Sequence, residues 1–338
     1  MNVPSLRARL GRFPRIPLGA CPTPLEPLER LSAPAQTALW IKRDDCIGPA
    51  MGGNKARKLE FLMADAQQRR ARKVVTFGGL QSNHARLTAA VARNLGMEPH
   101  LFYFEPRPRE LAGNLLLASM LDAKMHFVPL GRGGGMTLEA TNRLVRLLAW
   151  LFVGRAYFIP VGGHTALGCL GYVAAAAEIH SQVEQRELRN VTVVTAMGTG
   201  GTLAGLLAGF TLLHSPIRVL GIDVGKLWKG CPASIAHVAG EVCALLGEPQ
   251  TFAPADVPLI EECYVGPGYG IPSPEGNAAL RQIAQCAGVF LDPIYTGKAM
   301  AGLLDLVAEG NLEGDVIFLH TGGIPGLFAF PQIITHPT

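Results

Sequence analysis

Two lysines at the start of a predicted helix are the first residues of this chain that could do chemistry. Lys55 and Lys58 follow the pair Gly52-Gly53, and an apolar run over residues 59–66 comes next. Glycines carry no Cβ and let a backbone approach another group closely. A helix N-terminus favours anions and disfavours an ammonium group. A lysine at this place is therefore a surface residue, a phosphate ligand or an amine kept reactive for covalent chemistry.

A glycine-rich loop follows the strand predicted over residues 191–196. Its sequence is Gly198-Thr199-Gly200-Gly201-Thr202, and a helix is predicted directly after it. Successive N–H groups, two hydroxyls and a helix N-terminus suit a phosphate. The loop has no lysine at the Walker position and is not G-x-G-x-x-G, which disfavours a nucleoside triphosphate and a dinucleotide. A tight turn without a ligand is the structural alternative.

A second loop between a strand and a helix carries four consecutive polar residues, Gln81, Ser82, Asn83 and His84. Ser82 alone would cap the following helix, and that role would explain one of the four. Four polar side chains beside exposed amides suit a substrate carboxylate. His84 taken alone is more often a satisfied surface histidine than a catalyst.

Two tyrosines and two threonines also lie on predicted loops. Tyr295 and Thr296 precede the helix predicted over residues 297–309, Tyr269 lies in a turn-rich segment, and Thr321 follows the last predicted strand. A core tyrosine before a capped helix is the simpler interpretation of Tyr295 by itself. A reactive lysine, a phosphate loop and a carboxylate loop together indicate pyridoxal phosphate, which carries an aldehyde and a phosphate and acts on amino acids.

These loops need elements that position them, and strands alternate with helices along the chain. Strands are predicted at residues 39–42, 73–77, 101–104, 125–128, 157–161, 191–196, 217–224 and 315–320. Helices are predicted at residues 54–70, 82–95, 111–121, 138–152, 171–183, 201–213, 232–246, 275–287 and 297–309. The alternation predicts an α/β fold with parallel sheets. Ligands of such sheets bind beyond the carboxyl ends of the strands, where the polar loops fall.

Composition excludes several classes of protein. The chain has 338 residues, 49% of them hydrophobic and 17% charged, enough for two domains or one large α/β unit. A net charge of +4 without a long basic run argues against nucleic-acid binding. No stretch is typical of a membrane span. Seven cysteines without a C-x-x-C pair predict reduced thiols in the cytoplasm, with neither a disulfide framework nor a metal site.

With these residues in view, the chain resembles the D-cysteine desulfhydrase and 1-aminocyclopropane-1-carboxylate deaminase family. This family is a branch of the fold type II pyridoxal phosphate enzymes, the tryptophan synthase β group. The resemblance covers nearly the whole chain, and its most specific motifs are residues 41–45, 52–55, 81–84, 167–173 and 292–298.

The resemblance implies two parallel-sheet α/β domains with the cofactor in the cleft between them. Residues 1–58 and 165–338 would form the large pyridoxal phosphate-binding domain, and residues 59–164 the small inserted domain. It also implies a homodimer that acts on a small amino acid, without a nucleic-acid or membrane partner.

The resemblance also implies roles for residues. Lys55 would carry the cofactor as a Schiff base, and Lys58 with the loop Gly198 to Thr202 would hold its phosphate. Asn83 would contact the phenolic oxygen of the cofactor. The substrate carboxylate would bind Ser82 with its neighbours Gln81, Asn83 and His84, and Tyr269 and Tyr295 would face the substrate.

Two positions separate activities within the family. They are Thr296 and Thr321 here, as in D-cysteine desulfhydrases, whereas the deaminase pattern is glutamate and leucine. A hydroxyl at the pyridine nitrogen leaves the ring closer to neutral than a carboxylate does. A nearly neutral ring suits prompt loss of a β-leaving group better than ring opening.

The resemblance therefore favours α,β-elimination from D-cysteine to pyruvate, hydrogen sulfide and ammonia. The catalytic residues would be Lys55, Ser82, Tyr269 and Tyr295. The base is the freed Lys55 amine or a tyrosine, and Tyr269 or Tyr295 would donate a proton to the departing thiolate. L-Cysteate sulfo-lyase is the first alternative, because residues 133–135 are similar to such relatives and Arg132 or Lys226 could attract a sulfonate. The deaminase is the second alternative. His164 departs from the serine of many relatives and has no assigned role.

Two further alternatives lie outside these activities. One is a protein that binds the cofactor without meaningful catalysis, and the other is an α/β protein with a non-covalent phosphate ligand. The presence of Lys55, Tyr269 and Tyr295 argues against the first.

Overall fold

Two sheets form the framework of the protein in the computed structural model, which describes residues 1–31, 36–129, 136–261 and 263–335. A six-stranded sheet has the order β1-β2-β10-β7-β8-β9, and a four-stranded sheet has the order β5-β4-β3-β6. All neighbouring strands are parallel except β1, which pairs with β2 in the antiparallel sense. The predicted α/β class with parallel sheets is confirmed, with this one antiparallel edge added.

The strands of the two sheets come from different parts of the chain. The large sheet contains β1 (Leu25–Pro27), β2 (Thr37–Lys42), β7 (Thr192–Met197), β8 (Arg218–Asp223), β9 (Leu259–Ile260) and β10 (Gly314–Leu319). The small sheet contains β3 (Lys73–Phe77), β4 (Glu98–Tyr103), β5 (Lys124–Phe127) and β6 (Tyr157–Phe158). Every strand of the small sheet therefore lies between residues 59 and 164. The domain boundaries at these two positions stay a prediction.

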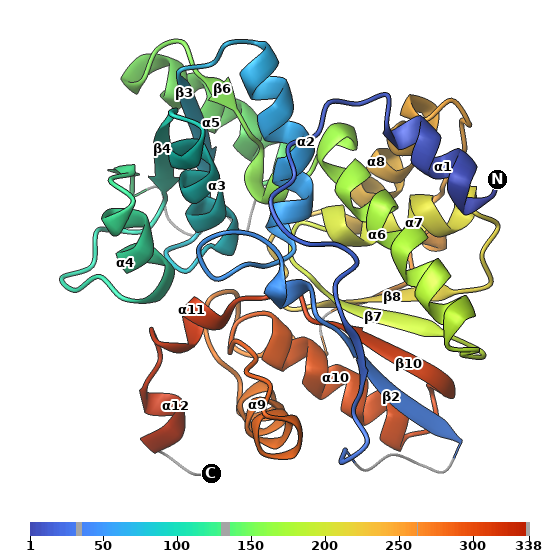
Figure 1. Cartoon of the computed structure of the whole chain (residues 1–338). Coiled ribbons are helices and arrows are strands. Elements are labelled where there is room, and N and C mark those ends of the chain that lie inside the picture. The colour runs from blue at the N-terminus through green and yellow to red at the C-terminus, as the bar shows by residue number, and fades with distance from the viewer. Residues whose placement is uncertain (32–35, 130–135, 262, 336–338) are drawn as a thin grey trace.

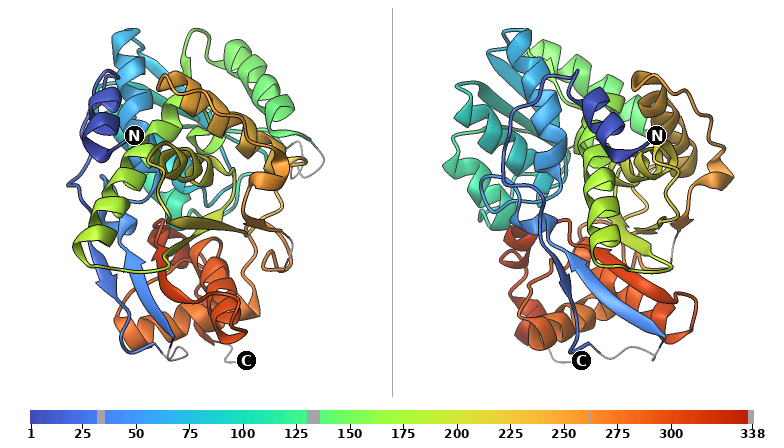
Figure 2. Two further views of the ribbon diagram at one scale, coloured as in Figure 1. Left: turned by 90° about the vertical axis from the view of Figure 1, so that its right-hand side faces the viewer. Right: turned by 45° about the vertical axis from the view of Figure 1, so that its right-hand side comes forward.

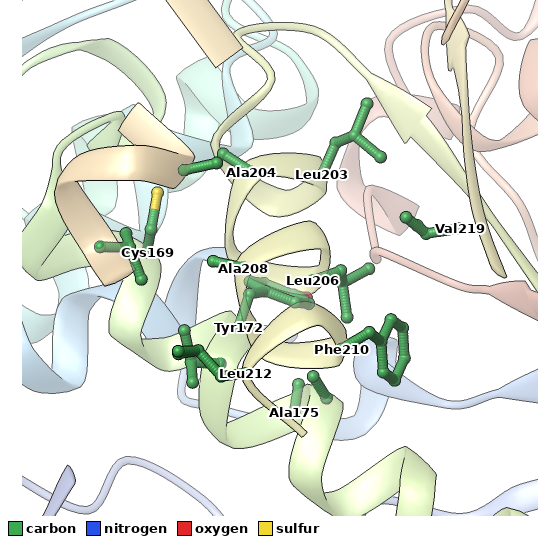
Figure 3. Packing of buried hydrophobic residues seen from close by; sticks show 14 of the residues in the cluster. Cys169, Tyr172, Ala175, Leu203, Ala204, Leu206, Ala208, Phe210, Leu212 and Val219 are labelled. Atoms are coloured by element: carbon green, nitrogen blue, oxygen red, sulfur yellow. The ribbon is translucent and has the colours of Figure 1, made fainter. Parts of the chain in front are cut away.

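Helices cover both faces of the large sheet (Figures 1 and 2). One face carries α1 (Val3–Leu10), α6 (Ala166–Gln185), α7 (Gly201–Leu212) and α8 (Cys231–Leu245). The other face carries α9 (Pro274–Ala287) and α10 (Thr296–Ala308). A helix that is apolar on all sides must be buried, and α7 lies in the largest apolar cluster (Figure 3).

The remaining helices belong mostly to the smaller half of the molecule. They are α2 (Lys55–Gln68), α3 (Asn83–Asn94), α4 (Gly113–Met120), α5 (Leu138–Phe152), α11 (Ile324–Leu327) and α12 (Gln332–Thr335). Three short 3-10 helices are η1 (Asp44–Cys46), η2 (Val161–Gly163) and η3 (Pro254–Asp256). In Figure 1 α2 lies between the small sheet and α6, and it also contacts α3. The helix that begins with Lys55 therefore connects the two halves.

Two elements differ from their predicted extents for local reasons. The strand predicted over residues 157–161 ends at Phe158, because Pro160 follows and Gly162 has a left-handed backbone with φ of 66°. The helix predicted from Gly171 begins five residues earlier, where the hydroxyl of Thr165 accepts from the Gly168 amide at 3.1 Å. The prediction also missed α1, β1, β9, α11 and α12, which are short or lie in proline-rich segments.

Glycines allow α6 to approach its neighbours on both sides. A Cβ at Gly205 of α7 would lie 2.5 Å from the Cβ of Tyr172, and one at Gly209 would lie 2.5 Å from the Cβ of Ala176. Towards α2, a Cβ at Gly171 would lie 2.1 Å from the carbonyl oxygen of Arg57. α2 can therefore lie this close to α6 only because residue 171 is a glycine and has no side chain.

Gly171→Ala is expected to lower the free energy of unfolding by about 1–3 kcal/mol, because a backbone carbonyl cannot rotate away from the new methyl group. Denaturant unfolding of the purified protein measures this change. Gly11→Ala is the control, since its new Cβ would meet no atom closer than 3.4 Å. The control should stay within about 0.5 kcal/mol, and equally small effects at both sites would contradict the close packing of α6 on α2.

Candidate active site

One pocket collects most of the residues predicted for the site. The loops that follow β3, β7 and β10 contribute to it, together with the start of α2. Its predicted members are Lys55, Lys58, Ser82, Asn83, His84, Gly198, Thr199, Gly200, Gly201, Thr202, Tyr269, Tyr295 and Thr321. It is also lined by residues that the prediction did not assign to it: Asn54, Val161, Gly162, Ala196, Leu203 and Leu227. Gln81 and Thr296 do not line this pocket.

The backbone before Lys55 is held against the end of the last strand. The Asn54 amide donates to the carbonyl oxygen of Thr321 at 3.0 Å, and Gly53 has φ of 123°. A Cβ at Gly53 would lie 3.1 Å from that same carbonyl oxygen, so a side chain there would be both strained and crowded. The Asn54 side chain donates to the hydroxyl of Thr202 at 3.0 Å. These bonds fix Lys55 relative to the glycine-rich loop.

Burial makes both lysine amines unusually acidic. Burial, with the neighbouring charge of Lys58, holds the pKa of Lys55 well below its usual value. Burial lowers the pKa of Lys58 to about 8. Among the described residues that line the pocket none is acidic. The lowered pKa makes the neutral, nucleophilic form of the Lys55 amine easier to reach, and the pocket as a whole favours an anion.

The glycine-rich loop forms a cup at the N-terminus of α7. Gly200 has φ of 82°, and a Cβ there would lie 2.4 Å from Cγ1 of Ile235. A Cβ at Gly201 would lie 2.7 Å from the Lys58 Nζ, which itself donates to the carbonyl oxygen of Gly162 at 3.0 Å. The first amides of a helix have no partner within the helix. A lysine beside these amides fits a phosphate group.

The loop after β3 divides its polar side chains between structure and pocket. Ser82 caps α3, because its hydroxyl accepts from the Ala85 amide at 3.2 Å. The Gln81 side chain points to the start of α4 instead. Its Oε1 accepts from the backbone amide of Asn114 at 2.9 Å, and its Nε2 donates to the carbonyl oxygen of Ala112 at 3.0 Å. Its predicted contact with substrate finds no support in this geometry.

Asn83 and His84 have defined orientations in the pocket. The Asn83 Oδ1 accepts from the Asn114 side chain at 2.9 Å, which leaves its Nδ2 as the group that can donate to a ligand. The His84 Nε2 lies 2.9 Å from the Thr76 hydroxyl. Burial, with the charges of Lys55 and Lys58, holds the pKa of His84 well below its usual value. His84 is therefore neutral and cannot pair as a cation with a substrate carboxylate.

Tyr269 and Tyr295 form a hydrogen-bonded pair with their hydroxyl oxygens 2.5 Å apart. The Tyr269 ring packs against Gly79 after β3 and Gly225 after β8, where added Cβ atoms would lie 2.9 and 3.0 Å from it. Burial raises the pKa of Tyr269 to about 12 and holds that of Tyr295 well above its usual value. Both hydroxyls are therefore protonated at neutral pH and can donate a proton.

Thr296 and Thr321 occupy different environments. The Thr296 hydroxyl donates to Oδ1 of Asp292 at 2.7 Å and accepts from the Asp292 amide at 2.8 Å, in the turn before α10. Thr321 lines the pocket. The Thr296 hydroxyl is thus already used in this turn. A direct contact of Thr296 with the cofactor stays a prediction.

Arg86 is a positioning residue that the sequence did not reveal. Its guanidinium donates to the carbonyl oxygens of Gly52, at 3.1 Å, and of Ala50. Its Nε donates to Oδ1 of Asn114 at 2.9 Å. Arg86 thus ties α3 to the loop before Lys55 and to the asparagine that orients Asn83. The available signal was a charged residue between the apolar residues Ala85 and Leu87 of α3.

Arg57 lies between the two pocket lysines but points into a buried ion cluster, which the sequence also did not reveal. Its guanidinium donates to both oxygens of Asp44, at 2.7 and 2.8 Å, and to both oxygens of Glu178, at 3.0 Å. Lys42 adds an ion pair to Glu178, and the Tyr172 hydroxyl donates to Asp44 at 2.8 Å. This cluster anchors the first turn of α2 to β2 and α6.

The site therefore combines a buried amine, an anion cup and a pair of protonated tyrosines. The chain belongs to the pyridoxal-phosphate dependent enzyme family, whose model matches residues 16–322. It is 41% identical to the D-cysteine desulfhydrases of Salmonella paratyphi A and Klebsiella pneumoniae, over 95% of this chain and 97% of each relative.

Solved structures show the same likeness. A crystal structure of a homologue of 1-aminocyclopropane-1-carboxylate (ACC) deaminase superposes with a TM-score of 0.87 at 35% identity, covering 98% of this chain and 99% of the other. O-ureido-L-serine synthase superposes with a TM-score of 0.61 at 20% identity, covering 90% of each chain, and so shares the fold alone. The fold type II prediction is confirmed.

Pyridoxal phosphate is thus the cofactor of this enzyme, and the pocket fits it. When bound, the cofactor supplies an aldehyde that condenses with an amine and a ring that withdraws electrons from the α-carbon of an amino acid. Lys55 would hold the aldehyde, Lys58 and the loop Gly198 to Thr202 the phosphate, and Asn83 the phenolic oxygen.

In the described part of the chain no helix has the length and apolarity needed to cross a membrane.

Proposed function

We propose that this enzyme catalyses α,β-elimination of D-cysteine. D-Cysteine and water give pyruvate, hydrogen sulfide and ammonia, so that atoms balance. The observation that carries the proposal is the hydrogen-bonded pair Tyr269–Tyr295, which lines the same pocket as Lys55. The D-cysteine desulfhydrases that share 41% identity with nearly the whole chain support the choice of substrate.

The opposite pKa shifts of these groups support a division of roles. A general base must be free of its proton, and a general acid must carry one. Burial lowers the pKa of Lys55 and raises that of both tyrosines. The Lys55 amine takes the α-proton in this proposal. Tyr269 or Tyr295 gives a proton to the departing sulfur. The hydrogen bond between the two hydroxyls lets the second tyrosine return a proton to the first.

Glu105 lies beside the tyrosine pair. Glu105 Oε1 and the Tyr269 hydroxyl lie 3.3 and 3.4 Å from a single point, the position of a Cβ at Gly79. The charge of Glu105 also contributes to the raised pKa of both tyrosines. Of the residues that suggested a sulfonate, Arg132 and residues 133–135 lie outside the described residues. Lys226 directly follows Gly225, against which the Tyr269 ring packs, and its attraction for a sulfonate stays a prediction.

Substrate comparison tests the proposal. Release of the 2-oxo acid should be measured side by side from D-cysteine, L-cysteine, L-cysteate and 1-aminocyclopropane-1-carboxylate, with sulfide and sulfite assayed separately. The expected result is rapid pyruvate and sulfide release from D-cysteine. Preferential sulfite release from L-cysteate would indicate the sulfo-lyase. Activity on the cyclopropane substrate with 2-oxobutanoate as the product would indicate the deaminase, and no product from any of the four would remove the proposal.

Tyr295→Phe is expected to reduce turnover of D-cysteine by roughly 10²–10³-fold while the cofactor absorbance is retained, because a proton donor is lost and the ring is kept. Tyr264→Phe is the matched control. Tyr264 makes its hydrogen bond to Asp305 and does not line the pocket. Unchanged turnover in Tyr295→Phe and in the corresponding Tyr269 variant would exclude the pair from proton transfer.

We further propose that the enzyme works as a homodimer in the cytoplasm. All seven cysteines are free thiols, which supports a reducing compartment. The dimer follows from the family resemblance alone. Sedimentation of the purified holoenzyme tests it, and a single species of the monomer mass of 35.9 kDa would exclude it.

A further inference from the structure

His164 is a buried histidine at the phosphate cup for which neither the resemblance nor the proposed reaction supplies a role. It follows η2 and precedes Thr165, the residue that caps α6. Its exposed fraction is 6%. The Nε2 atom lies 3.1 Å from the hydroxyl of Ser234 on α8, whereas Nδ1 is buried without a hydrogen-bond partner among the described residues. A buried polar atom without a partner points to a ligand.

The unpartnered nitrogen lies beside the first residue of the helix that begins the anion cup. A Cβ on Gly201, the first residue of α7, would lie 3.2 Å from His164 Nδ1 and 2.7 Å from Lys58 Nζ. The imidazole and the ammonium group therefore converge on the same backbone position. Gly201 also begins the helix whose free amides form the anion cup.

Nδ1 can carry the ring proton in one of the two tautomers that the hydrogen bond to Ser234 allows. A serine hydroxyl can donate to Nε2, and the proton of a neutral imidazole then lies on Nδ1. Burial, with the charge of Lys58, lowers the pKa of His164 to about 3, so the ring is neutral. A neutral donor adds a hydrogen bond without a third positive charge, which would lower the pKa of Lys55 further.

We infer that His164 is a ligand of the cofactor phosphate, to which its Nδ1–H donates while Ser234 holds the ring from the other side. The inference depends on the cofactor and not on which amino acid is the substrate. A failure of the D-cysteine assay would therefore leave it standing. It assigns to the cup a direct side-chain donor in addition to Lys58 and the loop amides.

The test uses two replacements that separate the nitrogens of the ring. The amide nitrogen of His164→Asn lies near the former Nδ1, whereas the amide of His164→Gln lies near the former Nε2. Apoenzymes are titrated with pyridoxal 5′-phosphate and with pyridoxal, which lacks the phosphate. Binding is followed by absorbance and by quenching of intrinsic fluorescence.

His164→Gln is expected to weaken binding of pyridoxal 5′-phosphate about 10–30-fold, which is typical of a lost hydrogen bond to a charged group. Its affinity for pyridoxal should stay within about twofold, and His164→Asn should retain most of the phosphate affinity. An equal loss for both ligands would show a structural role, and no loss would show that there is no contact. Either result overturns the inference.

A measurement on the unaltered protein covers the case in which a variant fails to fold. Nitrogen NMR of histidine-labelled wild-type enzyme should show one imidazole with a protonated Nδ1 whose signal shifts when pyridoxal 5′-phosphate binds and not when pyridoxal binds. A signal that responds equally to both ligands, or to neither, would also overturn the inference.

Discussion

Replacing Lys55 by alanine is expected to abolish pyruvate release, with a loss of at least roughly 10³-fold, and to remove the absorbance of the covalently held cofactor. The amine is the group that both binds the aldehyde and exchanges protons with the substrate. Burial and the charge of Lys58 lower the pKa of Lys55 and keep this amine neutral. No other lysine among the described residues that line the pocket has this freedom, because Lys58 bonds to Gly162 and faces the cup.

Spectra and product assays on the same preparations measure this effect. Borohydride reduces the covalent link, so the cofactor should stay attached to the wild-type protein after denaturation, whereas Lys55→Ala should release its cofactor under the same treatment. Lys124→Ala is the control, because Lys124 is a surface residue paired with Asp122. A Lys55→Ala protein that still turns over D-cysteine would remove Lys55 from the catalytic role. A wild type without a borohydride effect would favour a non-covalent phosphate ligand.

Arg57→Met is expected to lower the free energy of unfolding by about 3–5 kcal/mol, because it leaves buried carboxylates without their main counter-charge. The side chains of Asp44 and Glu178 are 0% and 9% exposed. Among the described residues Asp44 would keep as side-chain donors only the hydroxyls of Thr23 and Tyr172. Denaturant unfolding of the apoenzyme measures the change without a contribution from bound cofactor.

The loss of unfolding free energy in Arg57→Met should depend on pH, because it comes from the carboxylates of Asp44 and Glu178. Burial opposes the ionisation of Asp44 and Glu178, but Arg57 outweighs it and holds the pKa of each below its usual value. Groups of this kind stabilise the fold above their unfolded pKa and lose that effect as the pH falls through the folded pKa. Wild type and Arg57→Met should therefore converge in stability as the solution is acidified.

An exposed ion pair provides the control for Arg57. Arg69, which caps the C-terminus of α2, pairs with Asp65 of that helix, and its side chain is 69% exposed. Arg69→Met should change the free energy of unfolding by less than about 1 kcal/mol. Comparable losses of unfolding free energy in the two variants would mean that the buried cluster around Arg57 stabilises the fold no more than an exposed ion pair does.

Local signals were sufficient for most of the elements. The helix predicted at residues 82–95 is found as α3 with Ser82 as its cap, and the strand predicted at residues 73–77 is found as β3. Alternating strands and helices together with glycine-rich turns specify parallel α/β architecture wherever they occur. Short elements such as β9 and α11 lack this periodicity, because their contacts with the rest of the chain hold them in place.

Local signals were likewise sufficient for some residues of the site and insufficient for others. Lys55 and the loop Gly198 to Thr202 were identified because glycines before a helix leave a recognisable pattern, and they line one pocket. Gln81 was predicted to bind substrate because it belongs to a polar run, yet its side chain is used at the start of α4. Nothing in a linear run shows which of four adjacent side chains turns towards a neighbouring helix.

The sequence by itself determined the α/β class and predicted the lysine and the glycine-rich loop, since these depend on residue type and on spacing within one turn or strand. Only the tertiary structure showed that Arg57 faces a buried ion cluster, that Arg86 holds the loop before Lys55, and that the Tyr269 and Tyr295 hydroxyls meet. Each of these contacts joins segments far apart in the chain. Such contacts, and the burial that shifts the pKa values of Lys55 and both tyrosines, exist only after the elements have packed.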